Sequence, residues 1–384
     1  MREPVIIDAV RTPVGRSRGA LRNIRPDELY AGLISELLKR TGIGGEKIDD
    51  VITGCVTQYG EQGANIGRLA VLLSPLPPAV PAVTLNRMCG SSQQAVHFAA
   101  QSITSGDARY ILAGGVESMT RVPMFSDIKG GLENLNPNLS QKYELIHQGE
   151  SAERIADKYG LAREELDRFS FDSHSKAARA AKSGFFKGQI MPVTGVDAEG
   201  GPLILDYDEG IRFKPDLEKM SSLPPIFRSG GVITAANSSQ ISDGAALLLI
   251  ADREAAVADG FKPRARFRTR VVLGGDPTLQ LIEVIPATIK ALRSAGLNLS
   301  DIDVIEINEA FASVVLAWSR EIKPDMSRVN PNGGAIAHGH PLGATGAVLM
   351  TKLLYELERA DGQFGLQVMC IGHGMATATI IERL

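Results

Sequence analysis

Cys89 is the residue best placed to act as a nucleophile. It lies in the turn Asn86–Ser92, with the letters NRMCGSS, and residues 93–98 after it have helical character. A thiol at the start of a helix meets the positive end of the helix dipole, which lowers its pKa and favours the thiolate. Because the thiolate is the nucleophilic form, this position predicts covalent chemistry. The alternative is a small buried apolar residue without chemistry.

A glycine-rich loop, Asn332–Gly343, carries His338 and His340. An imidazole near pH 7 can accept the proton of a thiol or donate to an oxyanion. The glycines allow a ligand to approach the backbone closely. The alternative is a histidine that is hydrogen-bonded for structural reasons only.

Asn308 and Cys370 each lie at or near the end of an apolar run. Asn308 could hold a water or a carbonyl, although asparagine is also a common cap and turn residue. Cys370 could act as an acid or base, and the backbone beside it could donate to an oxyanion. A zinc site is conceivable, with ligands from Cys89, His340, Cys370 and His373. These residues lack the close paired spacing of structural zinc motifs, so no metal is expected.

The composition is that of an ordinary globular protein. The 384 residues are 44% hydrophobic and 22% charged, with a formal charge of −3. A chain without concentrated basic residues is not expected to bind nucleic acid. It has no run of about 18 apolar residues, so no membrane span is expected. Three cysteines and the absence of a signal-peptide pattern predict a cytoplasmic protein.

Short apolar runs alternate with helical patterns along the chain. The runs expected to be strands are 51–52, 110–113, 247–250, 304–307 and 377–381. Strands that are buried on both faces and separated by helices predict a layered α/β fold.

An internal repeat relates the two ends of the chain. A helix, a glycine and a strand recur around Gly42 and Gly296, with an offset of 254 residues. With the same offset, the position equivalent to Cys89 is Gly343, which is close to His340 in the sequence. We therefore expect two similar halves whose matching loops meet in one cleft, which would also contain Asn308. The alternative is chance, because this unit is common.

The segment 119–241 interrupts the alternation and is expected to be a domain inserted on the first half. The expected division is residues 1–118 with 242–263 for the first half, 119–241 for the insertion, and 264–384 for the second half.

Together these segments resemble the thiolase family of acyl-CoA acetyltransferases. The matching motifs are 86–89 (NRMC), 308–311 (NEAF), 339–341 (GHP), 370–372 (CIG), 8–15, 113–119 and 234–239. The resemblance covers essentially the whole chain. It implies duplicated βαβαβαββ halves, a five-layered α/β/α/β/α core with an inserted loop domain, and a homodimer or homotetramer.

The resemblance also implies a ping-pong mechanism with coenzyme A as a substrate and no permanently bound cofactor. Cys89 attacks a 3-oxoacyl-CoA and becomes acylated, after activation by His340. Asn308 holds a water, which with His340 forms one oxyanion hole. Cys370 protonates the departing acetyl-CoA carbanion. The backbone N–H groups of Cys89 and Gly372 form the second hole.

The resemblance implies that the inserted domain binds CoA, with His147, Arg212 and Ser239 near the nucleotide or pantetheine. Arg212 could meet a phosphate and Ser239 an amide, and the alternative for Arg212 and His147 is a solvated surface role. Three residues depart from the family pattern, namely Ser92, Gln148 and His373. We expect them to affect acyl preference and rate. His373 would either wall the acyl pocket or turn its side chain away.

Two other functions compete with thiolysis. A binding protein would hold acyl-CoA or lipid without turnover, but all four reactive residues are present. A ketoacyl-synthase type of condensing enzyme would have a second histidine in place of Cys370. The direction of the reaction, the acyl group and the oligomeric state stay open. The segments 54–58 and 234–249 resemble bacterial thiolases, some of which accept sterol side chains.

Overall fold

Two halves of the chain repeat the same order of strands and helices. The computed structural model describes residues 2–129 and 131–384. The first half contains β1 (Pro4–Arg11), α1 (Pro26–Thr41), β3 (Asp50–Gly54), α2 (Ile66–Leu73), β4 (Ala82–Leu85), α3 (Ser91–Ser105), β5 (Tyr110–Ser118) and β8 (Ser242–Asp252). The second half contains β9 (Ala265–Gly274), α9 (Val284–Ala295), β10 (Val304–Ile307), α10 (Ala312–Ile322), α12 (Thr345–Arg359), β11 (Phe364–Ile371) and β12 (Met375–Arg383).

The offset between the halves is the one that the sequence predicts. Helix α12 begins at Thr345 and α3 at Ser91, so the offset is 345 − 91 = 254. In the second half, the strand equivalent to β4 is reduced to a bridge between Ile305 and Val329. The duplicated α/β fold is therefore confirmed.

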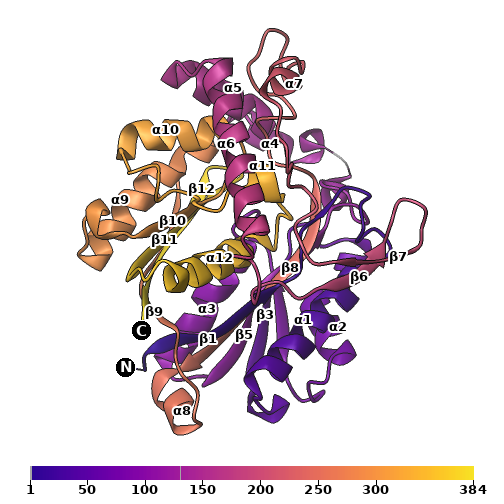
Figure 1. Cartoon of the computed structure of the whole chain (residues 1–384), viewed down its shortest axis with the longest axis vertical. Helices are drawn as coiled ribbons and strands as arrows, with labels where there is room; N and C mark the ends of the chain where they lie inside the picture. Colours follow the sequence, from indigo (N-terminus) through magenta and orange to yellow (C-terminus); the bar gives the residue numbers. More distant parts are fainter. Residues whose placement is uncertain (1, 130) are drawn as a thin grey trace.

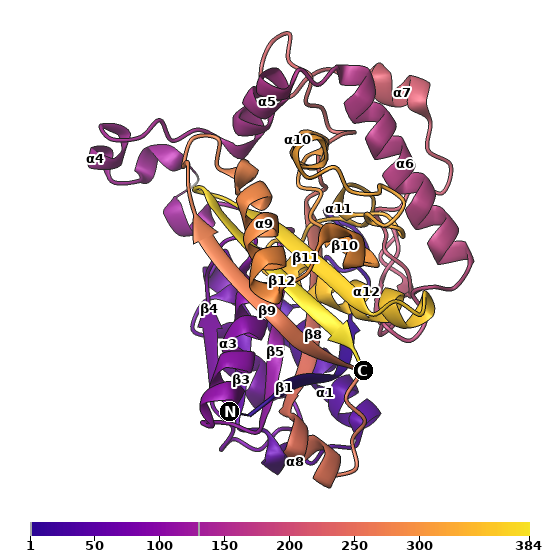
Figure 2. The same cartoon turned by 90° about the vertical axis from the view of Figure 1, so that its left-hand side faces the viewer.

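The elements form five layers, as expected (Figure 1; Figure 2). Helices α1 and α2 cover the outer face of the first sheet, which is built from β1, β3, β4, β5 and β8. Helices α3 and α12 pack against each other between the sheets, and α12 contacts strands of both. Helix α9 covers the outer face of β9, β11 and β12, and α10 packs beside it. This central helix pair positions the site, because both helices begin next to reactive residues.

The two half-sheets are joined at one corner. Strand β1 pairs with β9 through Val5 opposite Arg266 and Ile6 opposite Ala265. This short contact makes one continuous sheet with β4 and β10 at its edges, and the two-residue strand β2 (Gly15–Arg16) pairs with β8 beside it. Within each half, the first and last strands run antiparallel to their neighbours and the inner ones are parallel.

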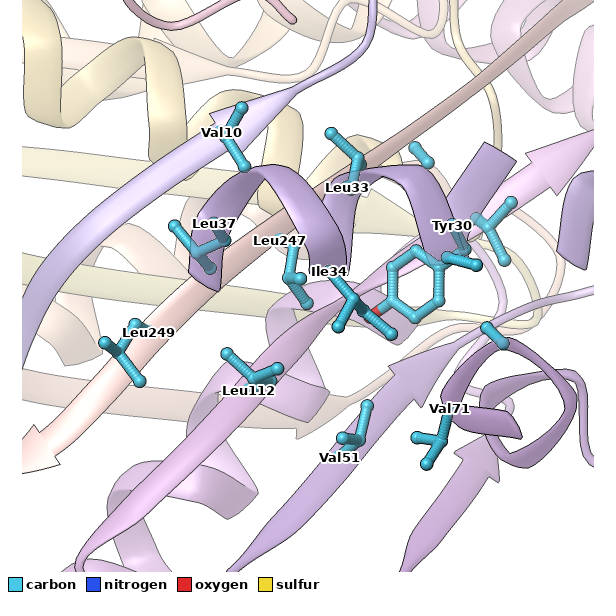
Figure 3. Packing of buried hydrophobic residues seen from close by; sticks show 14 of the residues in the cluster. Val10, Tyr30, Leu33, Ile34, Leu37, Val51, Val71, Leu112, Leu247 and Leu249 are labelled. Carbon is cyan, nitrogen blue, oxygen red and sulfur yellow. The ribbon is translucent and has the colours of Figure 1, made fainter. Parts of the chain in front are cut away.

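The strands bury side chains on both faces, as their apolar sequences predict. In β8, Leu247 and Leu249 pack under α1, whereas Leu248 and Ile250 face the central layer with α3 and α12. Figure 3 shows the outer cluster, where α1 presents Leu33, Ile34 and Leu37 to the sheet. Burying each such side chain contributes about 1.5–3 kcal/mol. In the part of the chain that the structure describes, no helix has the length and apolar character needed to cross a membrane.

The insertion contacts both halves, whereas the sequence predicts that it lies on the first. It contains α4 (Pro137–Ser140), α5 (Gln148–Tyr159), α6 (Arg163–Lys182), β6 (Val193–Val196), β7 (Pro202–Leu205) and α7 (Leu217–Ser221). Helices α5 and α6 pack against α10, and α6 also against α11 (Ala335–His338), in the second half. The β6–β7 hairpin buries Val193 and Leu205 in the outer core of the first half. The reason is that α5 and α6 have an apolar side that α10 covers.

Candidate active site

The turns at the starts of α3 and α12 meet in the centre of the molecule. Cys89 lies two residues before α3, and His340 lies five residues before α12. The Ser92 N–H donates to the Gly343 carbonyl at 3.1 Å, and its hydroxyl oxygen accepts from the Ala347 N–H at 2.9 Å. These bonds join the two turns that the repeat predicts to be equivalent. They also give Ser92, one of the departures from the family pattern, a defined contact.

The Cys89 turn is held in a tight conformation. Met88 has φ 48°, a left-handed value that costs free energy for a residue of this type. The turn is fixed by the Ser91 hydroxyl, which donates to the Met88 carbonyl at 2.6 Å and accepts from the Arg87 N–H at 2.9 Å. A Cβ on Gly90 would lie 2.3 Å from Cδ1 of Ile371, so a larger residue here would displace the Ile371 side chain at the end of β11. The sulfur of Cys89 is thereby brought beside the end of β11.

Burial raises the pKa of the Cys89 thiol to about 12. The sequence predicts a lowered pKa, and this prediction is wrong for the substrate-free structure. Cys89 is only 4% exposed. Transfer of its thiolate out of water raises the pKa by more than the positive end of the helix dipole lowers it. The nearby Cys370 also raises the pKa, whereas the backbone N–H of Gly372 donates toward the sulfur and lowers it. The resting group is therefore a neutral thiol that needs a base.

His340 has a defined tautomer. Its Nδ1 lies 2.7 Å from the Thr345 hydroxyl, which itself donates to the Pro341 carbonyl at 2.8 Å. Because the hydroxyl proton is used, Nδ1 carries the imidazole proton and Nε2 is free to accept one. Burial lowers the pKa of His340 to about 4, so the ring is neutral near pH 7. The geometry supplies a neutral base.

Asn308 connects His340 with Cys370. Its Nδ2 lies 3.4 Å from Nε2 of His340 and 3.7 Å from Sγ of Cys370. Its Oδ1 is buried and has no hydrogen-bond partner among the residues that the structure describes. Burial raises the pKa of Cys370 to about 11, while the bond from Asn308 opposes that rise. His340 and Cys370 can exchange protons with a small molecule placed between them, and the Asn308 amide can hydrogen-bond to it.

A cavity of about 770 Å³ opens onto this cluster. His340 lines it, whereas Cys89 and Cys370 lie beneath the surface. His147, Arg212 and Ser239 all line it as well. The lining is mainly apolar and includes Ile336 and Leu342 from the His340 loop, and its charged side chains include Lys214 and Lys219 along with Asp216.

The structure gives different surroundings to the three predicted CoA-binding residues. The His147 ring stacks on Phe227 with centroids 5.2 Å apart, and its Nδ1 accepts from the Gly149 N–H at the start of α5. The side chain of Arg212 is exposed and forms no ion pair within the described residues. Ser239 lines the cavity, and its N–H donates to the Ala310 carbonyl at 2.9 Å.

His373 does not line the cavity. It adopts φ 61° in the turn between β11 and β12, and its side chain is exposed. Of the two expectations for this residue, the structure fits the side chain turned away.

The zinc alternative loses His373 as a ligand. Among residues 2–129 and 131–384, no group of three or more His, Cys, Asp or Glu side chains is placed to hold a metal.

Sequence reasoning assigned no role to Glu117, which joins the loop after β3 to the His340 loop. Its buried carboxylate accepts from the Val56 N–H at 2.8 Å, the Thr57 N–H at 3.1 Å and the Gly343 N–H at 2.9 Å. Burial raises the pKa of Glu117, and these N–H donors oppose the rise. The feature of the sequence that could have indicated a role is that Glu117 is a lone carboxylate in the apolar, glycine-rich strand β5.

A buried ion pair supports the other side of the His340 loop. The Arg11 guanidinium contacts both carboxylate oxygens of Asp208 at 2.6 and 3.0 Å. Nδ1 of His338, two residues before His340, lies 2.7 Å from the same carboxylate. Burial alone would raise the pKa of Asp208, but Arg11 and His338 hold it well below its usual range. Arg11 lies in the motif 8–15 that the sequence singles out, but nothing in that motif indicates that Asp208 is its partner.

Comparison with known proteins gives consistent matches over the whole chain. Residues 4–254 match the model of the thiolase N-terminal domain, and residues 261–383 match that of the thiolase C-terminal domain. A steroid 3-ketoacyl-CoA thiolase of Mycobacterium tuberculosis is 48% identical, covering 100% of this chain and 95% of the relative. A 3-ketoacyl-CoA thiolase of Salmonella typhimurium is 45% identical over 100% of both chains. The crystal structure of the Bacillus anthracis acetyl-CoA acetyltransferase superposes with a TM-score of 0.92 at 36% identity, covering 100% of this chain and 99% of the other.

Proposed function

This chain belongs to the thiolase family, and from that premise we propose how its residues carry out CoA-dependent cleavage of a 3-oxoacyl-CoA. The enzyme is an acyltransferase. The observation that carries the proposal is the position of Asn308, whose amide reaches both Nε2 of His340 and Sγ of Cys370. One side chain thus connects a base with a second thiol, beside the buried Cys89.

Cys89 is the nucleophile. Nε2 of the neutral His340 accepts the thiol proton, and the sulfur attacks the keto carbon of the 3-oxoacyl-CoA. The negative charge then develops on the former keto oxygen, where the backbone N–H groups of Cys89 and Gly372 donate to it. The N–H of Gly372, which donates toward Cys89, supports this part of the proposal.

Cys370 is the acid. When the tetrahedral intermediate collapses, the bond between the α-carbon and the former keto carbon breaks and its electron pair stays on the acetyl-CoA fragment. The Cys370 thiol protonates this carbanion, which leaves as acetyl-CoA, and the acyl group remains on Cys89. His340 and a water on Asn308 stabilise the enolate oxygen. The unpartnered Oδ1 of Asn308 supports such a water.

CoA completes the cycle. The Cys370 thiolate accepts the proton of the CoA thiol, whose sulfur attacks the acyl group on Cys89. The protonated His340 returns its proton to the departing Cys89 sulfur. The products are acetyl-CoA and a shortened acyl-CoA, and all groups regain their resting protonation. The reverse reaction uses the same atoms for condensation of two acetyl-CoA molecules.

The cavity is the site for CoA. The basic side chains of Arg212, Lys214 and Lys219 in its lining support binding of phosphate groups. His147, stacked on Phe227, presents an aromatic wall, and Ser239 a hydroxyl for a pantetheine amide. The apolar wall near His340 is left for the acyl chain.

A second copy of the chain pairs along the edge of the first sheet. Strand β4 is at that edge, and Val83 in it is exposed. Leu72 and Leu73 on the adjacent α2 are exposed too. Open apolar edges of this kind are usually covered. The proposed homodimer predicts that Val83→Asp gives a monomer in light-scattering chromatography, and an unchanged mass would contradict it.

The cytoplasm is the proposed compartment. All three cysteines, Cys55, Cys89 and Cys370, are free thiols. Free thiols persist in reducing compartments.

The experiment for the reaction is CoA-dependent cleavage of acetoacetyl-CoA, followed by loss of the magnesium–enolate absorbance. It is run beside a long-chain and a ring-bearing 3-oxoacyl-CoA, since one relative is named for steroid substrates. Cleavage of any of them is expected, and the kcat/KM ratio ranks the acyl groups. Tight CoA binding without cleavage of any of the three would favour a binding protein instead.

A further inference from the structure

Gln280 joins three separate segments around the turn that contains Gly372. Its Oε1 accepts from the backbone N–H of His373 at 2.9 Å. Its Nε2 donates to the Ile146 carbonyl at 3.0 Å and to the Ser151 hydroxyl oxygen at 2.9 Å. Gln280 lies between β9 and α9 and is 3% exposed. All the hydrogen-bonding capacity of its amide nitrogen is used, because that nitrogen has two protons.

The backbone of Gln280 is itself strained. It has φ 31° and ψ −41°, which are unfavourable values for a residue with a side chain. Such a conformation persists where the surrounding contacts determine it. Here those contacts include the three side-chain bonds and a bond from the Gln280 N–H to the Asp276 carbonyl at 2.9 Å.

The turn that Gln280 holds has little room to move. A Cβ added to Gly372 would lie 2.6 Å from Nε2 of Gln148 and 3.6 Å from Oε1 of Gln280. Gly372 is therefore enclosed by two amide side chains, one from α5 of the insertion and one from the second half. The same Cβ would lie 3.7 Å from Cε of Met88, the residue before Cys89, and the Gly372 N–H is one of the groups that lower the pKa of the Cys89 thiol.

We propose that Gln280 is a positioning residue that keeps the Gly372 N–H directed at Cys89 by fixing the adjacent peptide through His373. This rests on the proposed function, in which that N–H also stabilises the oxyanion. Gln280 does not touch the reacting atoms, and its effect passes through the backbone of residues 372–373. Because its other two bonds go to the start of α5 and the residue before His147, it also couples the insertion to the oxyanion hole.

The test uses Gln280→Leu, which retains most of the volume and removes the three side-chain hydrogen bonds. Two readouts are made on the full-length protein: the rate of Cys89 alkylation by iodoacetamide at a fixed pH near 8, and kcat and KM for acetoacetyl-CoA thiolysis. We expect the alkylation rate at fixed pH to fall about tenfold, because the loss of about one hydrogen bond to the thiolate reduces the thiolate fraction by that factor. We expect kcat to fall roughly tenfold to a hundredfold, part of what the loss of an oxyanion donor costs, with KM for CoA nearly unchanged.

The alkylation readout separates positioning from general loss of stability. The groups that face Cys89 and influence its charge, Cys370 and Glu117, are unchanged in the variant. The matched control is Thr288→Val, which removes the buried hydroxyl bonded to Trp318 in the outer layer of the second half. Its stability should fall while the Cys89 alkylation rate and kcat stay at the wild-type values.

Ser151→Ala is the second variant. It removes one of the two acceptors that hold the amide of Gln280 and should move both readouts in the same direction by a smaller amount. This variant decides the question if Gln280→Leu does not fold. An unchanged Cys89 alkylation rate in the folded variants would overturn the proposal. Absence of thiolysis by the wild-type protein would instead contradict the proposed function, because alkylation of Cys89 does not require turnover.

Discussion

The Thr345 hydroxyl determines which nitrogen of His340 can act as a base. It lies 2.7 Å from Nδ1 and gives its own proton to the Pro341 carbonyl at 2.8 Å. It can therefore only accept from Nδ1–H, and this leaves Nε2 free on the side of Asn308. Thr345 is the first residue of α12, so the helix that separates the two sheets also sets the tautomer of the proposed base.

Thr345→Val should slow the reaction without weakening CoA binding. Valine has nearly the same shape but cannot accept from Nδ1, so the imidazole loses the contact that holds its tautomer. General base catalysis contributes about 10²–10⁴-fold, and we expect kcat to fall roughly tenfold to a hundredfold with KM for CoA nearly constant. The measurement is steady-state thiolysis of acetoacetyl-CoA.

Thr351→Val is the matched control for that variant. Thr351 lies in the same helix, is fully buried, and its hydroxyl donates to the Ala347 carbonyl at 2.8 Å. It has the same local bond as Thr345 without the histidine. Equal losses of kcat in both variants would mean that the effect comes from the helix and not from the tautomer.

The kcat/KM of thiolysis should not fall near pH 6.5, where an ordinary histidine becomes protonated. Burial lowers the pKa of His340 to about 4 and raises that of Cys89 to about 12. The base is active when neutral, so lowering the pH from 7 to 5 should leave it deprotonated and kcat/KM nearly constant. A histidine with an unperturbed pKa of about 6.5 would lose most of its activity over that range. A limb with a midpoint near 6.5 in the thiolysis profile would therefore contradict a buried neutral base.

The sequence predicts the features that depend on local pattern and on the repeat. The offset read from Gly42 and Gly296 is the offset between α3 and α12, and it correctly brings the Cys89 and His340 turns together. The strands with apolar residues on both faces are also predictable, because each is buried between helix layers.

The remaining features depend on contacts between distant segments. The pKa of Cys89 follows from its complete burial, which a helix-start pattern does not reveal. Gln280 is 93 residues from the backbone group that it holds, and nothing in its neighbours indicates the partner. The sequence predicts an insertion on the first half, because the pattern of residues 119–241 does not show that α10 covers α5 and α6.

Arg11→Leu should destabilise the protein strongly. It leaves the carboxylate of Asp208 buried with only His338 and neutral donors, and removal of one partner of a buried pair costs about 3–5 kcal/mol. The charged pair in the wild type holds the pKa of Asp208 low. Its contribution is therefore present at neutral pH and is lost only as the pH falls through that low pKa. Urea unfolding at pH 7 measures the difference.

Arg253→Leu serves as the comparison for Arg11→Leu. Arg253 also forms an ion pair, with Glu3 at 2.7 Å, but its side chain is 43% exposed. Solvent-exposed ion pairs contribute about 0–1 kcal/mol to the free energy of unfolding, so this variant should unfold at nearly the wild-type urea concentration. Similar midpoints for the two variants would show that the Arg11 pair has no special role in supporting the His340 loop.

Separate partial reactions should distinguish the two thiols. Cys89→Ala should not take up a radiolabelled acyl group from an acyl-CoA, because the variant lacks the sulfur atom that becomes acylated. Cys370→Ala should still be acylated, but should fail to exchange the α-protons of acetyl-CoA with deuterated water, because that step needs the Cys370 thiolate. Mass spectrometry of the protein and of acetyl-CoA gives both readouts.

Cys55→Ala is the control for both cysteine variants. Cys55 is fully buried, and burial followed by the charge of Glu117 raises its pKa well above the usual value. It lies beside Glu117, with Sγ 4.0 Å from the carboxylate, but no proposed step uses it. Acylation and exchange should therefore both persist in this variant. Acylation of Cys89→Ala would remove Cys89 as the nucleophile, whereas normal exchange in Cys370→Ala would transfer the acid–base role to His340, the other proton carrier in contact with Asn308.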